Sequence, residues 1–80
     1  MADNANTIDP TNLPADYKFE AKDFNKIADY IRSSNQGGFI TSLGETLRKS
    51  DLENARKLGV AFRSEFLAYL EEYNRRNPGA

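Results

Sequence analysis

The chain has 80 residues, which is the length of one small domain, and it contains no cysteine and no histidine. This composition excludes disulfide bonds and removes the usual ligands of zinc, haem and iron–sulfur centres, so we expect neither a metal nor a cofactor. With 11 basic and 12 acidic residues, the net charge of −1 gives no overall attraction to nucleic acid or to an anionic membrane.

The N-terminal stretch is polar and lacks a helical apolar pattern. Residues 1–17 carry three aspartates, no base and two prolines. We interpret residues 1–18 as a flexible acidic arm. In an alternative interpretation, Ile8 and Leu13 dock in an extended way on the helices or on a neighbouring subunit.

Residues 19–80 have the pattern of a helical domain, and its first helix is predicted over 21–33. Apolar residues recur there at i, i+3, i+4 and i+7: Phe24, Ile27, Ala28 and Ile31. Gly37 and Gly38 follow and permit a sharp reversal of the chain. A second, short helix is predicted over 39–49, with one apolar side formed by Phe39, Ile40, Leu43 and Leu47.

The longest pattern belongs to a third helix, predicted over 51–76. Its start matches a capping box, with Ser50 as the cap and Glu53 reaching back to it. Apolar residues then recur at three- and four-residue steps: Leu52, Ala55, Leu58, Gly59, Phe62, Phe66, Tyr69, Leu70 and Tyr73. Pro78 ends the helix. We therefore expect an all-α fold, a small three-helix unit in which two shorter helices pack antiparallel against a long C-terminal helix.

Several short motifs in the second half resemble a known group of proteins. They are Gly-Gly-Phe at 37–39, Ser-Asp-Leu-Glu-Asn at 50–54, Phe-Leu-Ala-Tyr-Leu at 66–70 and Asn-Pro at 77–78. The pattern is similar to a family of short helical proteins encoded by bacteriophages and by bacteria that carry phage genes. The resemblance implies a compact helical fold and a phage-related origin. That family has no assigned activity, so the resemblance implies no active site.

A second, thin apolar stripe lies off the main face of the predicted third helix. Val60 and Leu67 are seven residues apart and are flanked by Arg56 and Arg63. We interpret these four residues as a candidate interface with a second copy or with another protein. The alternative is that they are scattered apolar residues of an ordinary surface, which need no explanation.

Lys18, Lys22 and Lys26 are spaced four apart and form a candidate line of phosphate contacts. The acidic residues Glu20, Asp23 and Asp29 dilute this line, which favours a solvated face instead.

A helix-turn-helix is the other interpretation that we considered for the C-terminal third. If Ala55 and Gly59 held the conserved places of such a motif, Glu65 would occupy a buried position without a partner, which is costly. The unbroken helical period through Gly59 also indicates one continuous helix. We therefore expect no helix-turn-helix.

No constellation of residues predicts catalysis. The acidic pairs have capping or charge-pairing roles, and Ser33 and Ser34 have no histidine to activate them. We therefore expect no catalytic residues and predict a small, non-enzymatic, phage-type interaction protein that binds a host factor or a virion component, as a homo-oligomer. The alternative is an accessory protein that binds nucleic acid.

No apolar stretch reaches the roughly 18 residues of a membrane-spanning helix, so we expect a cytoplasmic protein without membrane contacts.

Overall fold

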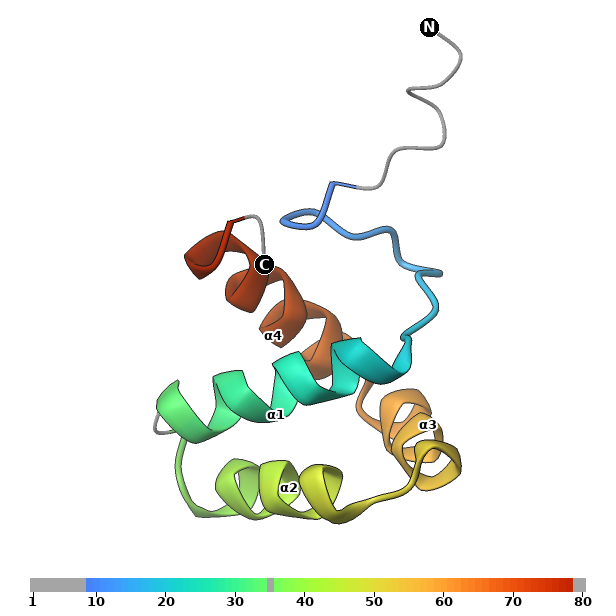
Figure 1. Cartoon of the computed structure of the whole chain (residues 1–80), viewed down its shortest axis with the longest axis vertical. Helices are drawn as coiled ribbons and strands as arrows, with labels where there is room; N and C mark the ends of the chain where they lie inside the picture. Colours follow the sequence, from blue (N-terminus) through green and yellow to red (C-terminus); the bar gives the residue numbers. More distant parts are fainter. Residues whose placement is uncertain (1–8, 35, 79–80) are drawn as a thin grey trace, which may run out of the picture.

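A computed structural model describes residues 9–34 and 36–78, and within these residues the chain is all-helical, with four helices and no strand. The helices are α1 (Ala21–Ser34), α2 (Gly38–Lys49), α3 (Leu52–Ala61) and α4 (Arg63–Arg76) (Figure 1). The prediction of an all-α fold is confirmed, as are its first two helices to within one residue. The long C-terminal helix is wrong, because two helices stand in its place.

The start of α1 is fixed by a reciprocal pair of hydrogen bonds. The Asp23 N–H donates to the Glu20 carbonyl at 2.9 Å, and the Glu20 N–H donates to the Asp23 carboxylate at 2.8 Å, which is the logic of a capping box. The Tyr17 hydroxyl also donates to Asp23, at 2.7 Å. Asp23 is only 3% exposed, so these bonds satisfy a buried polar side chain and join the arm to α1.

Helix α2 runs antiparallel to α1 (Figure 1). The reversal uses Gly37, whose φ of 94° is the only positive glycine φ in the described part of the chain. The two helices approach closely at Gly44, where an added Cβ would lie 2.6 Å from the Ile31 Cγ2 atom. Glycine at this position therefore permits the packing of the two helices.

The turn between α2 and α3 differs from the predicted capping box. Asp51 is the N-cap of α3, and its carboxylate accepts the Asn54 N–H at 2.9 Å. The Ser50 hydroxyl instead donates to the Thr46 carbonyl at 2.7 Å, so it belongs to the end of α2. The prediction that Ser50 is the N-cap was wrong by one residue. The next residue, Asp51, takes this place, because Asp is an equally good N-cap.

The helical path is interrupted at Phe62, whose φ of −118° and ψ of 38° lie outside the helical region. A straight helix over 51–76 would be about 39 Å long, almost twice the roughly 21 Å of α1. Helix α1 is therefore too short to cover the whole apolar stripe of such a helix. Because of the interruption, α4 can cross α1, and α3 can lie beside the beginning of α1. The Phe62 ring fills the corner between the rings of Phe39 (6.0 Å) and Phe66 (6.3 Å).

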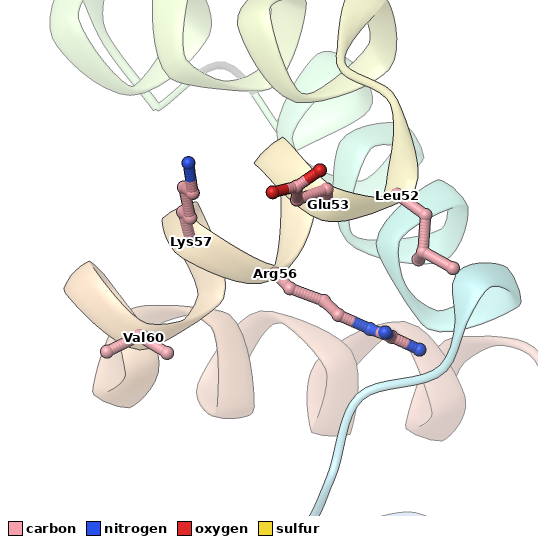
Figure 2. A pocket seen from close by; sticks show the side chains of 5 residues that line it. All are labelled: Leu52, Glu53, Arg56, Lys57 and Val60. Carbon is pink, nitrogen blue, oxygen red and sulfur yellow. The ribbon is translucent and has the colours of Figure 1, made fainter.

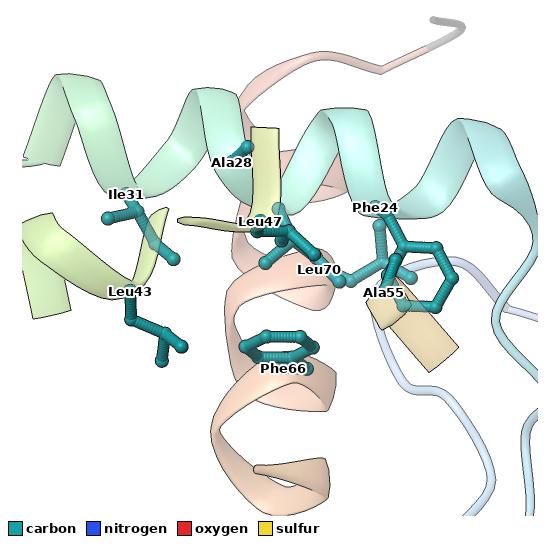
Figure 3. Packing of buried hydrophobic residues seen from close by; sticks show 9 residues of the cluster. Phe24, Ala28, Ile31, Leu43, Leu47, Ala55, Phe66 and Leu70 are labelled. Carbon is teal, nitrogen blue, oxygen red and sulfur yellow. The ribbon is translucent and has the colours of Figure 1, made fainter. Parts of the chain in front are cut away.

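The core lies where α1, α2 and α4 meet (Figure 3). Phe66 and Leu70 of α4 and Ile27 and Ile31 of α1 are its largest fully buried side chains. Helix α3 contributes little to this core. It buries Ala55 and Gly59, and so most of its surface is left in contact with solvent.

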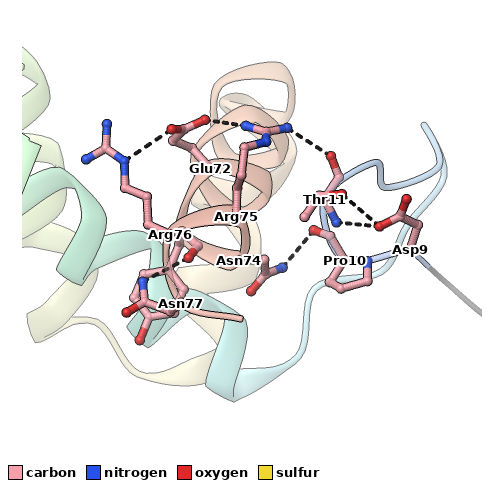
Figure 4. Close-up of polar contacts among 9 residues, drawn as sticks. Asp9, Pro10, Thr11, Glu72, Asn74, Arg75, Arg76 and Asn77 are labelled. Carbon is pink, nitrogen blue, oxygen red and sulfur yellow. Dashed lines mark hydrogen bonds and ion pairs between the residues drawn. The ribbon is translucent and has the colours of Figure 1, made fainter. Parts of the chain in front are cut away.

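Residues 9–18 lie along α4 and are held there mainly through their backbone. The Leu13 N–H donates to Glu71 at 2.6 Å. Asn74 donates to the Pro10 carbonyl at 2.9 Å, and Arg75 donates to the Thr11 carbonyl at 3.1 Å (Figure 4). Leu13 also packs against the core. Leu13 therefore lies as the alternative interpretation of the arm predicted, docked on the helices. Ile8, the other residue in that interpretation, lies outside the described residues.

Candidate protein-interaction surface

The outer side of α3 exposes apolar and basic side chains together. Leu52, Arg56 and Val60 follow each other at four-residue steps, and Glu53 and Lys57 lie beside them (Figure 2). Val60 is 79% exposed and Leu52 is 40% exposed. We call these five residues the α3 surface. Two of the three large hydrophobic side chains exposed in the described part of the chain belong to it.

Two shallow grooves meet at Arg56 and Val60. The five residues of the α3 surface line the first groove. The second groove separates α3 from the end of the arm, and it is lined by Lys18, Phe19, Phe24, Arg56, Gly59, Val60 and Arg63. Arg56 and Val60 therefore form a ridge between two grooves.

One wall of the second groove is formed by packed aromatic rings. The Phe19 ring lies 5.6 Å from the Phe24 ring and 6.2 Å from the Phe66 ring. Gly59 provides the space for this, since a Cβ there would lie 3.2 Å from both Phe19 and Phe24. Tyr17 packs on Phe19, and burial, followed by the hydrogen bond to Asp23, raises the pKa of the Tyr17 hydroxyl well above its usual value.

Of the four predicted interface residues, the structure places Arg56 and Val60 on the α3 surface. Arg63 lies in the first turn of α4, where its Nε donates to the Ala15 carbonyl at 2.9 Å and a terminal nitrogen donates to the Tyr17 carbonyl. Its guanidinium also lies 5.6 Å from the centre of the Phe19 ring. Arg63 thus holds the arm while one side of it lines the second groove.

Leu67 is half-buried on α4 and lines neither groove. Its predicted alignment with Val60 required one continuous helix, and the interruption at Phe62 removes that spacing.

The predicted line of lysines is divided between two places. Lys18 precedes α1, so the four-residue spacing does not put it on a helical face with Lys22 and Lys26. It lines the groove beside α3, whereas Lys22 and Lys26 line a different groove that also contains Glu20 and Asp23. Lys22 lies 3.8 Å from the Glu20 carboxylate, and the Lys26 ammonium lies 5.9 Å from the centre of the Tyr73 ring.

The interruption at Phe62 also changes one argument against a helix-turn-helix. The argument that one continuous helix excludes the motif was wrong, because α3 and α4 are separate helices. Glu65 is exposed, so it does not occupy the buried position that the motif would give it. Helix α4 is nevertheless a poor recognition helix. One side of it buries Phe66 and Leu70 in the core, and the arm lies along another through Arg63, Asn74 and their neighbours.

The described residues hold no group of three His, Cys, Asp or Glu side chains that could bind a metal ion. The same part of the chain has no helix with the length and apolar character needed to cross a bilayer. The α3 surface can bury the apolar side chains of Leu52 and Val60 against a partner, and its Arg56 and Lys57 can pair with anionic groups.

Leu52, Lys57 and Phe19 are parts of the site that the sequence did not indicate. Leu52 fits the core stripe of the predicted helix, yet it follows directly after the cap residue Asp51, where the helix has not yet reached its neighbours. Comparisons with protein-family models, with curated proteins and with solved structures find no match for this chain. The resemblance to the phage-encoded family therefore stays a prediction.

Proposed function

We propose that this chain is a small non-enzymatic protein of phage type that binds a protein partner, a host factor or a virion component, through the α3 surface. We place this binding in the cytoplasm. The observation that carries the proposal is the exposure of Leu52 and Val60 on both sides of Arg56, on the helix that contributes least to the core.

Three features support a protein as the partner. Single exposed apolar residues are common on any surface, but two on one helix face, next to grooves, form a patch that can lose water on binding. Arginine is also among the residue types that dominate binding energy in protein interfaces. Moreover, Val60 makes little contribution to the core, so a partner can cover its side chain without changing the packing of the fold.

The proposal predicts that Val60→Asp abolishes partner binding without unfolding the chain. A carboxylate placed in the centre of the buried patch should weaken binding by at least about thirtyfold, the effect of losing about 2 kcal/mol at one dominant residue. Ala68→Asp, on the exposed side of α4, introduces the same charge away from the surface and should have no effect. Circular dichroism checks that both variants remain helical.

The partner is first identified by photo-cross-linking in the cells that naturally make the protein. A benzophenone amino acid at position 60 should give one dominant cross-linked protein, and the same group at position 68 should not. Binding of that purified protein to the wild type and to the two Asp variants then tests the surface. Equal cross-linking at both positions, or equal binding by Val60→Asp, would contradict the proposal.

Nucleic acid is a second candidate, because Lys18, Arg56, Lys57 and Arg63 line the two neighbouring grooves. This surface differs from the predicted lysine line, since Lys22 and Lys26 do not belong to it. Fluorescence anisotropy with labelled DNA and RNA, at about 50 mM and about 200 mM salt, distinguishes the two classes of partner. Salt-sensitive binding that is lost in Arg56→Glu but kept in Val60→Asp would favour nucleic acid over protein.

The predicted homo-oligomer remains a separate proposal. It rests on the small core that 80 residues can form. Sedimentation velocity of the purified chain tests it, and a mass equal to one chain at every concentration contradicts it. We expect Val60→Asp to leave this mass unchanged, because two-fold pairing through α3 would bring the basic residues of two copies together.

A further inference from the structure

We infer that the segment bound by the α3 surface is an amphipathic helix that carries carboxylates. This inference rests on the proposed function, and it specifies the chemistry of the partner.

The first argument is the charge around the ridge. Four basic residues and one acidic residue line the two grooves: Lys18, Arg56, Lys57 and Arg63 against Glu53. The whole chain, in contrast, has slightly more acidic than basic residues. The two grooves therefore present a local excess of positive charge that an acidic partner complements.

The second argument is that these positive charges are not compensated within the chain. The side chains of Lys18, Arg56 and Lys57 make no hydrogen bond or ion pair with the residues that the structure describes. Arg63 donates only to backbone carbonyls, which carry no full negative charge. A carboxylate beside the ridge would give these groups partners without breaking an existing ion pair.

The third argument is the geometry of the apolar residues. Leu52 and Val60 are eight positions apart, about 12 Å along the helix axis. Apolar residues two turns apart on a facing helix are separated by about 11 Å, which is close to this distance. A helix satisfies its own backbone hydrogen bonds, whereas a β-strand needs main-chain partners, and α3 uses its own N–H and C=O groups internally. A helical partner therefore fits the surface better than a β-strand.

The same charges disfavour a second copy as the occupant. A two-fold interface places the same surface of two chains face to face. Such an interface would bring together Lys18, Arg56, Lys57 and Arg63 of both copies, with only Glu53 of each copy to compensate them. An excess of like charge in an interface is costly.

The experiment is a selection from a displayed library of helical peptides with randomised surface positions, using the purified full-length chain. We expect the enriched peptides to carry Asp or Glu beside apolar residues at i, i+4 and i+7. Binding should fall at least about tenfold in Val60→Asp and in Arg56→Glu and should be unchanged in Ala68→Asp. A selected peptide in which the critical Glu is replaced by Lys should regain affinity for Arg56→Glu, which separates a direct charge contact from a general loss of folding.

Peptides without acidic enrichment, or peptides whose affinity is indifferent to Arg56→Glu, would overturn the inference. So would an empty selection. If a natural partner cross-links at position 60 but its bound segment is neutral or not helical, this inference fails and the proposed function stands. If nothing binds at position 60, both fail.

Discussion

Two glycines, one on α2 and one on α3, lie where an added Cβ would come close to neighbouring side chains. Gly44 and Gly59 both lie inside helices, where glycine costs up to about 1 kcal/mol relative to alanine. At Gly44 an added Cβ would overlap the branched Cβ region of Ile31, at 2.6 and 3.1 Å. At Gly59 it would meet ring edges at 3.2 Å, which small ring movements can accommodate.

We therefore predict that Gly44→Ala destabilises the chain and that Gly59→Ala does so much less. Overpacking a core typically costs about 1–3 kcal/mol, and about 1 kcal/mol lowers the melting temperature of a domain this small by about 4–8 °C. Thermal unfolding followed by circular dichroism measures both variants. If Gly44→Ala melts at or above the wild-type temperature, the close approach of α1 and α2 is wrong.

The Tyr17–Asp23 hydrogen bond predicts a pH dependence of stability. The pKa of Tyr17 is raised in the folded state, chiefly by burial and then by the bond to Asp23. Its contribution is fully present below the usual tyrosine pKa of about 10 and is lost as the pH rises above that value, because the unfolded chain then releases the proton first.

Tyr17→Phe should cost about 1–3 kcal/mol at neutral pH, because it leaves the buried Asp23 with one partner fewer. The difference between the two proteins should shrink above about pH 10. Urea unfolding between about pH 7 and pH 11 gives both free energies of unfolding. A difference that stays constant across this range would show that Tyr17 does not titrate with the fold.

At the scale of elements, the arm and α4 form one unit through side chains that bind the backbone. Arg63 holds the carbonyls of Ala15 and Tyr17, and residues further along α4 hold the arm between residues 10 and 13. Because these bonds are to the main chain, they depend little on the side chains of the arm. They also position the residues before α1, including Phe19, that form one wall of the second groove.

Arg63→Ala should therefore loosen the arm while leaving the four helices folded. We expect faster amide hydrogen exchange at residues 15–19, and a loss of stability of about 1 kcal/mol for the lost hydrogen bonds. Arg32→Ala removes the same side chain at an exposed position on α1 and serves as the control. Unchanged exchange at residues 15–19 in Arg63→Ala would show that this contact does not hold the arm.

At the scale of the whole molecule, the first two helices could be predicted because their apolar residues form narrow stripes and glycines separate them. The division of the last helix could not, because the apolar period continues unbroken through Phe62 and neither proline nor glycine stands there. At this interruption the Phe62 ring packs against Phe39, which is distant in sequence, and against Phe66, which is one turn further along the chain. The contact with Phe39 is a tertiary contact, which a local pattern does not indicate.

The site was predictable to the same limited degree. Val60 and Arg56 departed from the core pattern and could be identified. Leu52 fitted the core pattern and is exposed, and Arg63 had the pattern of a surface residue and holds the arm. Leu52 is exposed because it stands at the start of α3, directly after the cap residue Asp51. Only the alignment of Leu67 with Val60 depended on treating α3 and α4 as one rod.

The most direct test of the account is a nuclear magnetic resonance titration of the labelled chain with the partner identified by cross-linking. The account predicts that the largest amide shift changes fall on residues 52–60 and on Lys18 and Phe19. If they fall instead on the exposed side of α4, at Ser64, Glu65 and Ala68, or on the α2 side of the groove between α2 and α3, at Thr46 and Lys49, the α3 surface is not the binding site.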